Sequence, residues 1–404
     1  MLVESHSDDF SKHNKIGIEE IGFYTSNLCF SLERLAQYNK QDSAKYIVGL
    51  GQEKMSIISI HDDIITMAYN AAAEFLSTIN KQKIDLLLFA TESDIDHSRS
   101  AASILRHELE LSEECRCLDI KHACYGGTGA INIARDFVYA HSNKKVLVVM
   151  SDIAFYGIGS PGEPTQGCGA IAMLISTEPK IATFNDDDMF YINKSDDFYR
   201  PAYQVNPIYD GHLSVRSYLE MFARSMKIYY QKSEYFDFLI SHMPFTKMLS
   251  KCCKLANIDA DLNSNDIICK YQKLVGNTYT ASLYIGLLSL LENIDSDLSD
   301  KKLALFSYGS GAQCALFSVS IIRGYQKHLR RHMHLDILQS RQELDYDAYC
   351  SSWKAFELRE KALNWKNKTC NIPVITQSCK DDTNKLEIYE IKNGVRLYKK
   401  VSSN

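Results

Sequence analysis

The stretch that decides the fold reads Lys121-His122-Ala123-Cys124-Tyr125-Gly126-Gly127-Thr128-Gly129-Ala130. The apolar residues Leu118 and Ile120 precede it, and a helical pattern continues after it to Arg135. This order predicts a strand, a sharp turn and a helix, with the Cys124 thiol at the helix N-terminus. The positive end of a helix dipole lowers a thiol pKa and favours the nucleophilic thiolate. On its own, the stretch is equally compatible with the nucleophile of an acyl-transfer enzyme and with a small buried cysteine.

Composition narrows the class of protein. The chain has 404 residues, 45% of them hydrophobic, which is enough for one large or two closely packed domains. A net charge of -5 gives no electrostatic reason to expect a nucleic-acid partner. We find no signal peptide and no apolar run long enough to cross a membrane. The 12 cysteines are scattered without a Cys-x-x-Cys pair, so we expect a cytoplasmic protein with reduced thiols and no metal.

Strand and helix patterns alternate along the chain, which predicts an α/β architecture. The almost continuous apolar run at 85–90 predicts a strand buried on both faces. Beyond about residue 323 the chain becomes charged and helical, and it ends in two short apolar segments. The segments with helical character are 62–80, 100–109, 130–141, 326–332 and 349–363.

Two segments about half a chain apart repeat the same pattern. A strand at 144–150 leads through a glycine-containing loop to an apolar strand at 167–175. A strand at 301–306 leads through a similar loop to another at 315–319. Such short repeats support duplication only weakly. Together with a nucleophilic cysteine in the first half, they point to the two-fold repeated thiolase fold.

Six motifs make the chain resemble the hydroxymethylglutaryl-CoA synthases, particularly the bacterial kind, over residues 16–400. Each motif is short, but all six occur in the family's order and at its separations. They are ATESDID (90–96), KHACYGGT (121–128), GEPTQGCGA (162–170), SHMPFTKM (241–248), GNTYTAS (276–282) and SYGSG (307–311).

The resemblance implies a thiolase-like fold. Two pseudo-repeated βαβαβαββ halves, at 16–180 and 181–325, would form five layers in the order α-β-α-β-α. Residues 326–404 would be a C-terminal excursion of helices and strands that packs on the core. The polar composition of residues 1–15 predicts a disordered extension.

The same resemblance implies the reaction. The family condenses acetyl-CoA with acetoacetyl-CoA and water, giving 3-hydroxy-3-methylglutaryl-CoA and CoA, with no cofactor beyond these thioesters. Cys124 would take the acetyl group, and Glu92 would remove a methyl proton and later return one. His242 would polarise the acetoacetyl carbonyl. From the residues alone, Glu92 is a solvated carboxylate and His242 a structural histidine, although a buried strand before Glu92 can raise its pKa.

Substrate-contacting residues follow from the matched positions. Lys247 and Lys251 correspond to lysines that meet the CoA phosphates, a role suited to point charges. Asn277 can hydrogen-bond a thioester or carbonyl oxygen, and the loop at Ser310 can offer a backbone N–H to an oxyanion. The other matched positions, which alone would be turn or surface residues, are Asp42, Tyr156, Thr165 and Ser214.

The resemblance also implies a homodimer in which the strand at 115–120 pairs with its copy across a two-fold axis. Three alternatives remain. A β-branching synthase of polyketide assembly would take its acceptor from an acyl carrier protein, although the segment 197–214 favours the mevalonate-pathway enzymes. A ketosynthase or thiolase is disfavoured because those relatives lack a glutamate base like Glu92. An inactive acyl-CoA-binding scaffold is disfavoured by the intact Glu92, Cys124 and His242.

Overall fold

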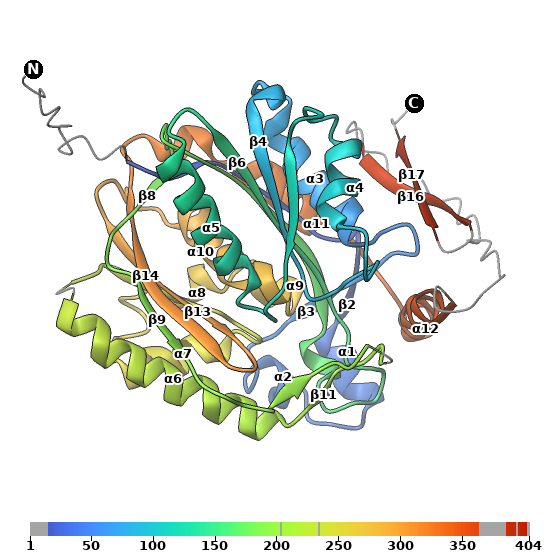
Figure 1. Ribbon diagram of the computed structural model, residues 1–404. Coiled ribbons are helices and arrows are strands. Elements are labelled where there is room, and N and C mark those ends of the chain that lie inside the picture. The colour runs from blue at the N-terminus through green and yellow to red at the C-terminus, as the bar shows by residue number, and fades with distance from the viewer. Residues whose placement is uncertain (1–14, 203, 233–234, 363–384, 393–394, 402–404) are drawn as a thin grey trace, which may run out of the picture.

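The structure is a computed structural model that describes residues 15–202, 204–232, 235–362, 385–392 and 395–401 (Figure 1). The extension predicted at 1–15 lies outside these ranges except for Lys15. Within them, no helix combines the length and the apolar character needed to cross a bilayer.

The first half of the chain builds a five-stranded unit of mixed direction. The pairs β1–β7 and β7–β6 are antiparallel, whereas β6–β4 and β4–β5 are parallel. Nearly every residue of β4, β6 and β7 is buried, as continuous apolar runs predict for strands covered on both faces. In spatial order the strands are β1 (Gly17–Tyr24), β7 (Gly167–Ser176), β6 (Lys145–Ala154), β4 (Ile84–Ala90) and β5 (Arg116–Ile120).

The second half repeats these pairings. Two short strands, β8 and β9, pair antiparallel with β14, which pairs antiparallel with β13, which pairs parallel with β12. In the described residues this half has no strand equivalent to β5. The duplication expected from the sequence is therefore visible in the strand order. The strands are β8 (Ala182–Phe184), β9 (Met189–Ile192), β12 (Phe238–Ser241), β13 (Lys302–Gly309) and β14 (Gln313–Ile321).

Helices cover both faces of each half-sheet, and the five layers of a thiolase-like fold result (Figure 1). Helices α5 (Gly126–Ala140) and α10 (Ser282–Asn293) lie between the half-sheets, where their apolar residues join one core cluster. Helices α3 (Ile64–Leu76) and α4 (Ala101–Glu108) belong to a second core cluster on the outer face of the first half-sheet. Helices α6 (Gly211–Lys232) and α7 (Lys247–Leu255) cover the second half-sheet.

The C-terminal segment packs on the first half. It consists of α11 (Arg331–Gln339), α12 (Tyr346–Ala362) and a hairpin of β16 (Lys385–Lys392) and β17 (Val395–Val401). The Ile388 backbone N–H donates to the His61 carbonyl at 2.8 Å. The helix predicted at 326–332 is wrong, because only a 3-10 turn forms at Tyr325–His328 before α11. The intervening Arg330 leaves helical geometry and donates to Glu20 on β1 at 2.9 Å.

The remaining elements are short. A small sheet pairs β15 with β2 and β2 with β3, and a two-stranded ribbon pairs β10 with β11. Their bounds, with those of the short helices, are β2 (Leu28–Ser31), α1 (Leu32–Tyr38), α2 (Ala44–Ile47), β3 (Lys54–Ile57), β10 (Phe198–Tyr199), β11 (Ile208–Tyr209), α8 (Asn265–Ile268), α9 (Gln272–Val275) and β15 (Gln342–Glu343).

Candidate active site

The predicted nucleophile and base meet at one edge of the first half-sheet. Glu92 follows β4, and Cys124 lies between β5 and α5. Because β4 and β5 are parallel, their carboxyl ends lie at the same edge. The Cys124 Sγ donates a hydrogen bond to the Glu92 Oε1 at 3.1 Å. Two residues that are 32 positions apart therefore form a thiol–carboxyl pair.

The turn that presents Cys124 is tightly constrained. Ala123 has a φ of 42°, in the left-handed region that non-glycine residues rarely adopt. Helix α5 begins at Gly126, earlier than the position near 130 that helical periodicity predicts. Gly309, at the end of β13, packs directly against this turn, and a Cβ there would lie 2.6 Å from the Tyr125 nitrogen. The absence of a side chain at Gly309 thus allows this strand end, and the loop with Ser310 that follows it, to approach the Cys124 turn.

Asp152, which sequence reasoning missed, holds the Glu92 loop in place. It lies buried near the end of β6. Its Oδ1 accepts hydrogen bonds from the Glu92 N–H at 2.8 Å, the Thr91 hydroxyl at 2.8 Å and the Ser93 N–H at 3.0 Å. Its Oδ2 accepts from the Thr280 N–H at 3.1 Å, which ties this loop to the second half. A carboxylate just after the apolar run at 146–150 was the available signal in the sequence.

Burial raises the pKa of Glu92 to about 8, and the nearby Asp152 carboxylate contributes to the increase. The positive charge of Arg200 and the Cys124 hydrogen bond act in the opposite direction. The apolar surround of the strand end had predicted such a rise. A carboxyl group with a pKa near the working pH can both accept and return a proton.

The expected lowering of the Cys124 pKa is wrong for the ligand-free site. The thiol pKa lies well above its ordinary value, because burial and the carboxyl group of Glu92 both disfavour the thiolate. These effects outweigh the helix N-terminus, whose influence is confined to the first turn. Cys124 is therefore a neutral thiol here, and it donates its hydrogen bond to Glu92.

His242 comes from the second half. It directly follows β12, and its backbone N–H donates to the Phe306 carbonyl of β13 at 2.8 Å. The Tyr218 hydroxyl donates to the His242 carbonyl at 2.6 Å. The side chain is 2% exposed, and burial lowers its pKa to about 3. The imidazole is therefore neutral at physiological pH and can donate one N–H to a substrate oxygen.

Three of the predicted binding residues form one connected group. The Asn277 Nδ2 donates to the Tyr156 hydroxyl at 3.1 Å, and the Asn277 backbone N–H donates to the Thr165 carbonyl at 3.0 Å. Gly276 has a φ of 85° and touches the backbone at Gln166, which lets the two motif loops meet. Ser214 stands apart from this group, and its hydroxyl donates to the Asp197 Oδ2 at 2.8 Å.

The other predicted binding residues lie together at a different place. Lys247 is exposed at the start of α7, and its backbone N–H donates to the Leu50 carbonyl at 3.1 Å. The Lys251 ammonium lies 5.3 Å from the centre of the Phe245 ring. Asp42 is exposed just before α2, in the segment that leads to Leu50. The structure therefore brings the α2 segment and the two lysines of α7 to the same region of the surface.

Comparison with known proteins identifies the family. The family model described as hydroxymethylglutaryl-coenzyme A synthase N terminal matches residues 12–180, and the corresponding C-terminal model matches residues 254–379. The chain belongs to the hydroxymethylglutaryl-CoA synthase family. The family resemblance inferred from the six motifs is thereby confirmed.

Individual relatives agree. A hydroxymethylglutaryl-CoA synthase from Enterococcus faecalis is 38% identical over 83% of this chain and 90% of its own length. A crystal structure of an HMG-CoA synthase complexed with CoA is 34% identical, covers 96% of this chain and all of the other, and superposes with a TM-score of 0.85. The curacin-pathway HMG synthase in complex with an acetyl donor-ACP is 24% identical over 96% and 100% of the two chains, with a TM-score of 0.87, which shows the fold alone.

Proposed function

We propose that this hydroxymethylglutaryl-CoA synthase condenses acetyl-CoA with acetoacetyl-CoA and water to give 3-hydroxy-3-methylglutaryl-CoA and CoA. The observation that supports this most directly is the 3.1 Å contact between the Cys124 thiol and Glu92 at a helix N-terminus. It places a nucleophile beside a carboxyl group whose pKa suits proton transfer. The family assignment supplies the substrates.

The first step is acetyl transfer. The Cys124 sulfur attacks the thioester carbon of acetyl-CoA, the bond from that carbon to the CoA sulfur breaks, and CoA leaves with the thiol proton. Backbone N–H groups at the start of α5 and in the loop at Ser310 stabilise the oxyanion. The acetyl methyl group is then held beside Glu92, so that the next step gains from proximity.

Condensation uses the base and the histidine. Ionised Glu92 removes a proton from the acetyl methyl group, and the resulting carbanion attacks the ketone carbon of acetoacetyl-CoA. The neutral His242 N–H donates to that ketone oxygen, which withdraws the negative charge as the bond forms. Glu92 returns its proton to the alkoxide. Water then hydrolyses the thioester to Cys124 and releases the product.

The alternative acceptor is a thioester on an acyl carrier protein, as in polyketide β-branching. The relative at 38% identity favours free CoA, because the carrier-protein complex matches at only 24%. The two lysines of α7, Lys247 and Lys251, are also suited to CoA phosphates.

Initial rates with acetoacetyl-CoA and with acetoacetyl-carrier protein, at matched concentrations, test this choice. We expect faster turnover of the CoA thioester.

The Lys251→Ala variant should have a higher KM for acetoacetyl-CoA and a largely unchanged kcat, because the lysine binds the CoA phosphates equally in the ground and transition states. In the comparison of the two acceptors, faster turnover of acetoacetyl-carrier protein than of acetoacetyl-CoA would assign the enzyme to polyketide β-branching.

We also propose a place in the mevalonate pathway of isoprenoid biosynthesis, in the cytoplasm, with no metal or cofactor beyond the CoA thioesters. The substrates support the pathway, and the unpaired cysteines of the described residues support the compartment. The chemistry itself needs a nucleophile, a base and a hydrogen-bond donor, and Cys124, Glu92 and His242 supply these.

We infer a homodimer that pairs β5 with its copy. This strand ends the sheet next to β4, its residues are mostly exposed, and Leu118 is 48% exposed. An unpaired edge strand exposes backbone groups and invites aggregation. Pairing across a two-fold axis would cover it and hold the Cys124 turn that follows it.

We expect the interface to bury more than about 2,000 Å² in total. Sedimentation at micromolar protein concentration should therefore show one species near twice the 45.9 kDa chain mass. Leu118→Glu should shift the protein toward monomer because it places a charge in the interface. Leu262→Glu, at a site that is 82% exposed, is the matched control and should stay dimeric. A stable, active wild-type monomer at that concentration would disprove the interface.

A further inference from the structure

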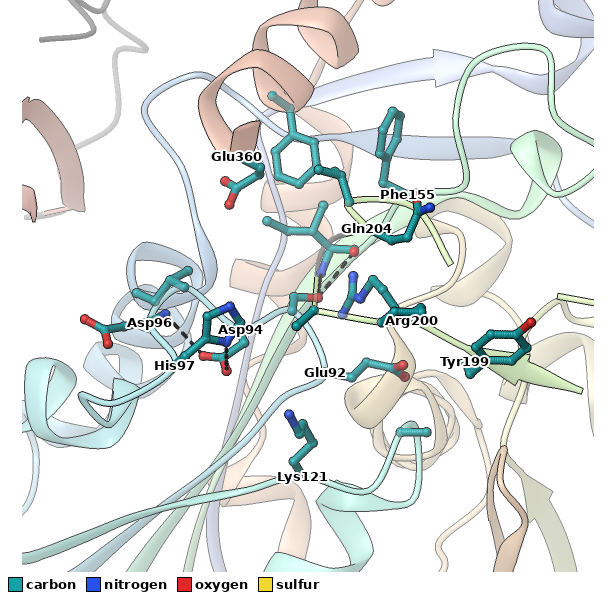
Figure 2. A pocket seen from close by; sticks show the side chains of 18 of the residues that line it. Glu92, Asp94, Asp96, His97, Lys121, Phe155, Tyr199, Arg200, Gln204 and Glu360 are labelled. Carbon is teal, nitrogen blue, oxygen red and sulfur yellow. Dashed lines mark hydrogen bonds and ion pairs between the residues drawn. The ribbon is translucent and has the colours of Figure 1, made fainter. Parts of the chain in front are cut away.

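A cavity of about 800 Å³ opens beside the catalytic pair (Figure 2). Its wall includes Glu92 and Ala123, the residue before the nucleophile. It is also lined by Phe356 of α12 and by Arg396 of β17, from the C-terminal segment. The cavity does not involve Lys247 or Lys251. Glu92 therefore faces a cavity that is separate from the lysine region of the surface.

Most charged side chains in this cavity are already paired. Arg396 forms ion pairs with Asp63 at 2.9 Å and with Glu360 at 3.0 Å. Arg99 lies 3.6 Å from Asp96. Arg200 and Lys121 differ, because no acidic group of the described residues lies within salt-bridge distance of either. Of these two cations, Arg200 is the one whose charge acts on the Glu92 carboxyl group.

Packing fixes where Arg200 lies. It directly follows β10, whose Phe198 packs edge-on against Tyr156 and Tyr279, with ring centres 6.4 and 6.1 Å away. Figure 2 shows its side chain extending into the cavity near Glu92. Its charge reaches that carboxyl group and opposes the rise of the Glu92 pKa. An arginine without an acidic partner is thus held beside the base.

The last step of the proposed reaction creates an anion at this place. Water attacks the acyl carbon on Cys124, the carbon–sulfur bond breaks, the thiol recovers a proton, and the released acid ionises to a carboxylate. That carboxylate forms beside Glu92 and Asp152, two acidic groups that would repel it. A cation must therefore lie on the open side of the site if the product is to be stabilised there.

We propose that Arg200 is the subsite for the carboxylate that forms on hydrolysis of the Cys124 thioester. Its planar guanidinium matches a carboxylate through two parallel N–H donations. The inference rests on the proposed condensation, since that reaction leaves on Cys124 the hydroxymethylglutaryl group that water releases as a carboxylate. It adds a residue that contacts the product to the proposed catalytic side chains.

Binding of two ligands to one set of variants tests the subsite. 3-Hydroxy-3-methylglutaryl-CoA carries the carboxylate, and 3-hydroxy-3-methylbutyryl-CoA is the same molecule without it. Both are titrated by calorimetry in a Cys124→Ala background, where no turnover occurs. Arg200→Gln should lower the affinity for 3-hydroxy-3-methylglutaryl-CoA by about tenfold to a hundredfold, the range for a lost hydrogen bond between charged groups. The affinity for 3-hydroxy-3-methylbutyryl-CoA should stay unchanged.

Two variants make the comparison specific. Arg200→Lys should recover much of the lost affinity because it restores the charge but not the bidentate geometry. Arg99→Gln removes a cation that lines the same cavity but is paired with Asp96, and it should change neither affinity. Equal weakening of both ligands by Arg200→Gln, or no weakening of either, would overturn the subsite.

Acetylation separates this proposal from the proposed function. With Cys124 intact, Arg200→Gln should still form the acetyl-enzyme from acetyl-CoA, because no carboxylate exists at that stage. If the wild-type enzyme neither acetylates nor condenses, the proposed function fails. If the wild-type enzyme does both and the ligand comparison shows no difference, only the Arg200 subsite fails.

Discussion

Incubation with acetyl-CoA alone is expected to add one acetyl group to the peptide that contains Cys124, and Cys124→Ala is expected to abolish it. Overall turnover should fall by about 10⁴-fold or more, since loss of a covalent nucleophile removes the intermediate itself. Mass spectrometry of the digested protein locates the acetyl group, and a coupled assay of CoA release follows turnover.

A second cysteine provides the control for this experiment. Cys117 is also partly exposed, and it lies on β5 just before the nucleophile turn. Cys117→Ala should acetylate and turn over normally, because the structure gives its thiol no contact with Glu92. Acetylation at Cys117, or at no cysteine, would show that Cys124 is not the nucleophile.

Glu92→Ala is expected to separate the two chemical steps. Acetylation should persist, because removing Glu92 takes away a carboxyl group that raises the Cys124 pKa. Condensation should fall by about 10²–10⁴-fold, the usual contribution of a general base. The measurement is the acetyl-enzyme by mass spectrometry together with product formation from acetoacetyl-CoA. Loss of acetylation in a natively folded Glu92→Ala protein would contradict the assigned role.

His242→Ala is the matched comparison. The side chain comes from the second half and is buried, so it should serve the acceptor and not the acetyl donor. This variant should acetylate normally and handle acetoacetyl-CoA poorly. Loss of acetylation in a natively folded His242→Ala protein, or an unchanged KM for acetoacetyl-CoA, would contradict this role.

The pH dependence of condensation follows from the same carboxyl group. The base form of Glu92 is the ionised form, and its pKa is about 8. Below that value most of the enzyme holds a protonated Glu92, so the condensation rate should rise with pH and level off above about 8. The rate of single-turnover condensation by preformed acetyl-enzyme, measured at a series of pH values, shows this rise directly. A rate that is already flat from pH 5 to 7 would show that Glu92 is not the titrating base.

Much of the fold could be predicted because buried strands and helices have recognisable patterns of apolar residues in the sequence. The run at 85–90 became β4, and helical periodicity at 62–80 and 100–109 located α3 and α4. The helix at 326–332 could not be excluded in this way, because its end depends on the attraction of Arg330 to Glu20, 310 positions earlier in the chain.

Some residues of the candidate site could be predicted from the sequence, and others could not. The family motifs pointed to Cys124, Glu92 and His242, whereas the residues alone favoured a solvated carboxylate and a structural histidine for the last two. Asp152 was missed because its importance lies in donors from two loops, one of which is 128 positions away. Arg200 was missed because nothing in its own segment shows that it lacks an acidic partner.

The sequence by itself determined most of the strand and helix order, since that depends on neighbouring residues and their periodicity. The role of Cys124 as nucleophile follows from the family resemblance and stays a prediction. Only the tertiary structure decided the electrostatics. Burial beside Glu92 raises the pKa of Cys124, whereas the helix N-terminus alone would lower it. A pKa depends on solvent exclusion and on charges within a few ångströms, and in a folded chain those come from segments far apart in sequence.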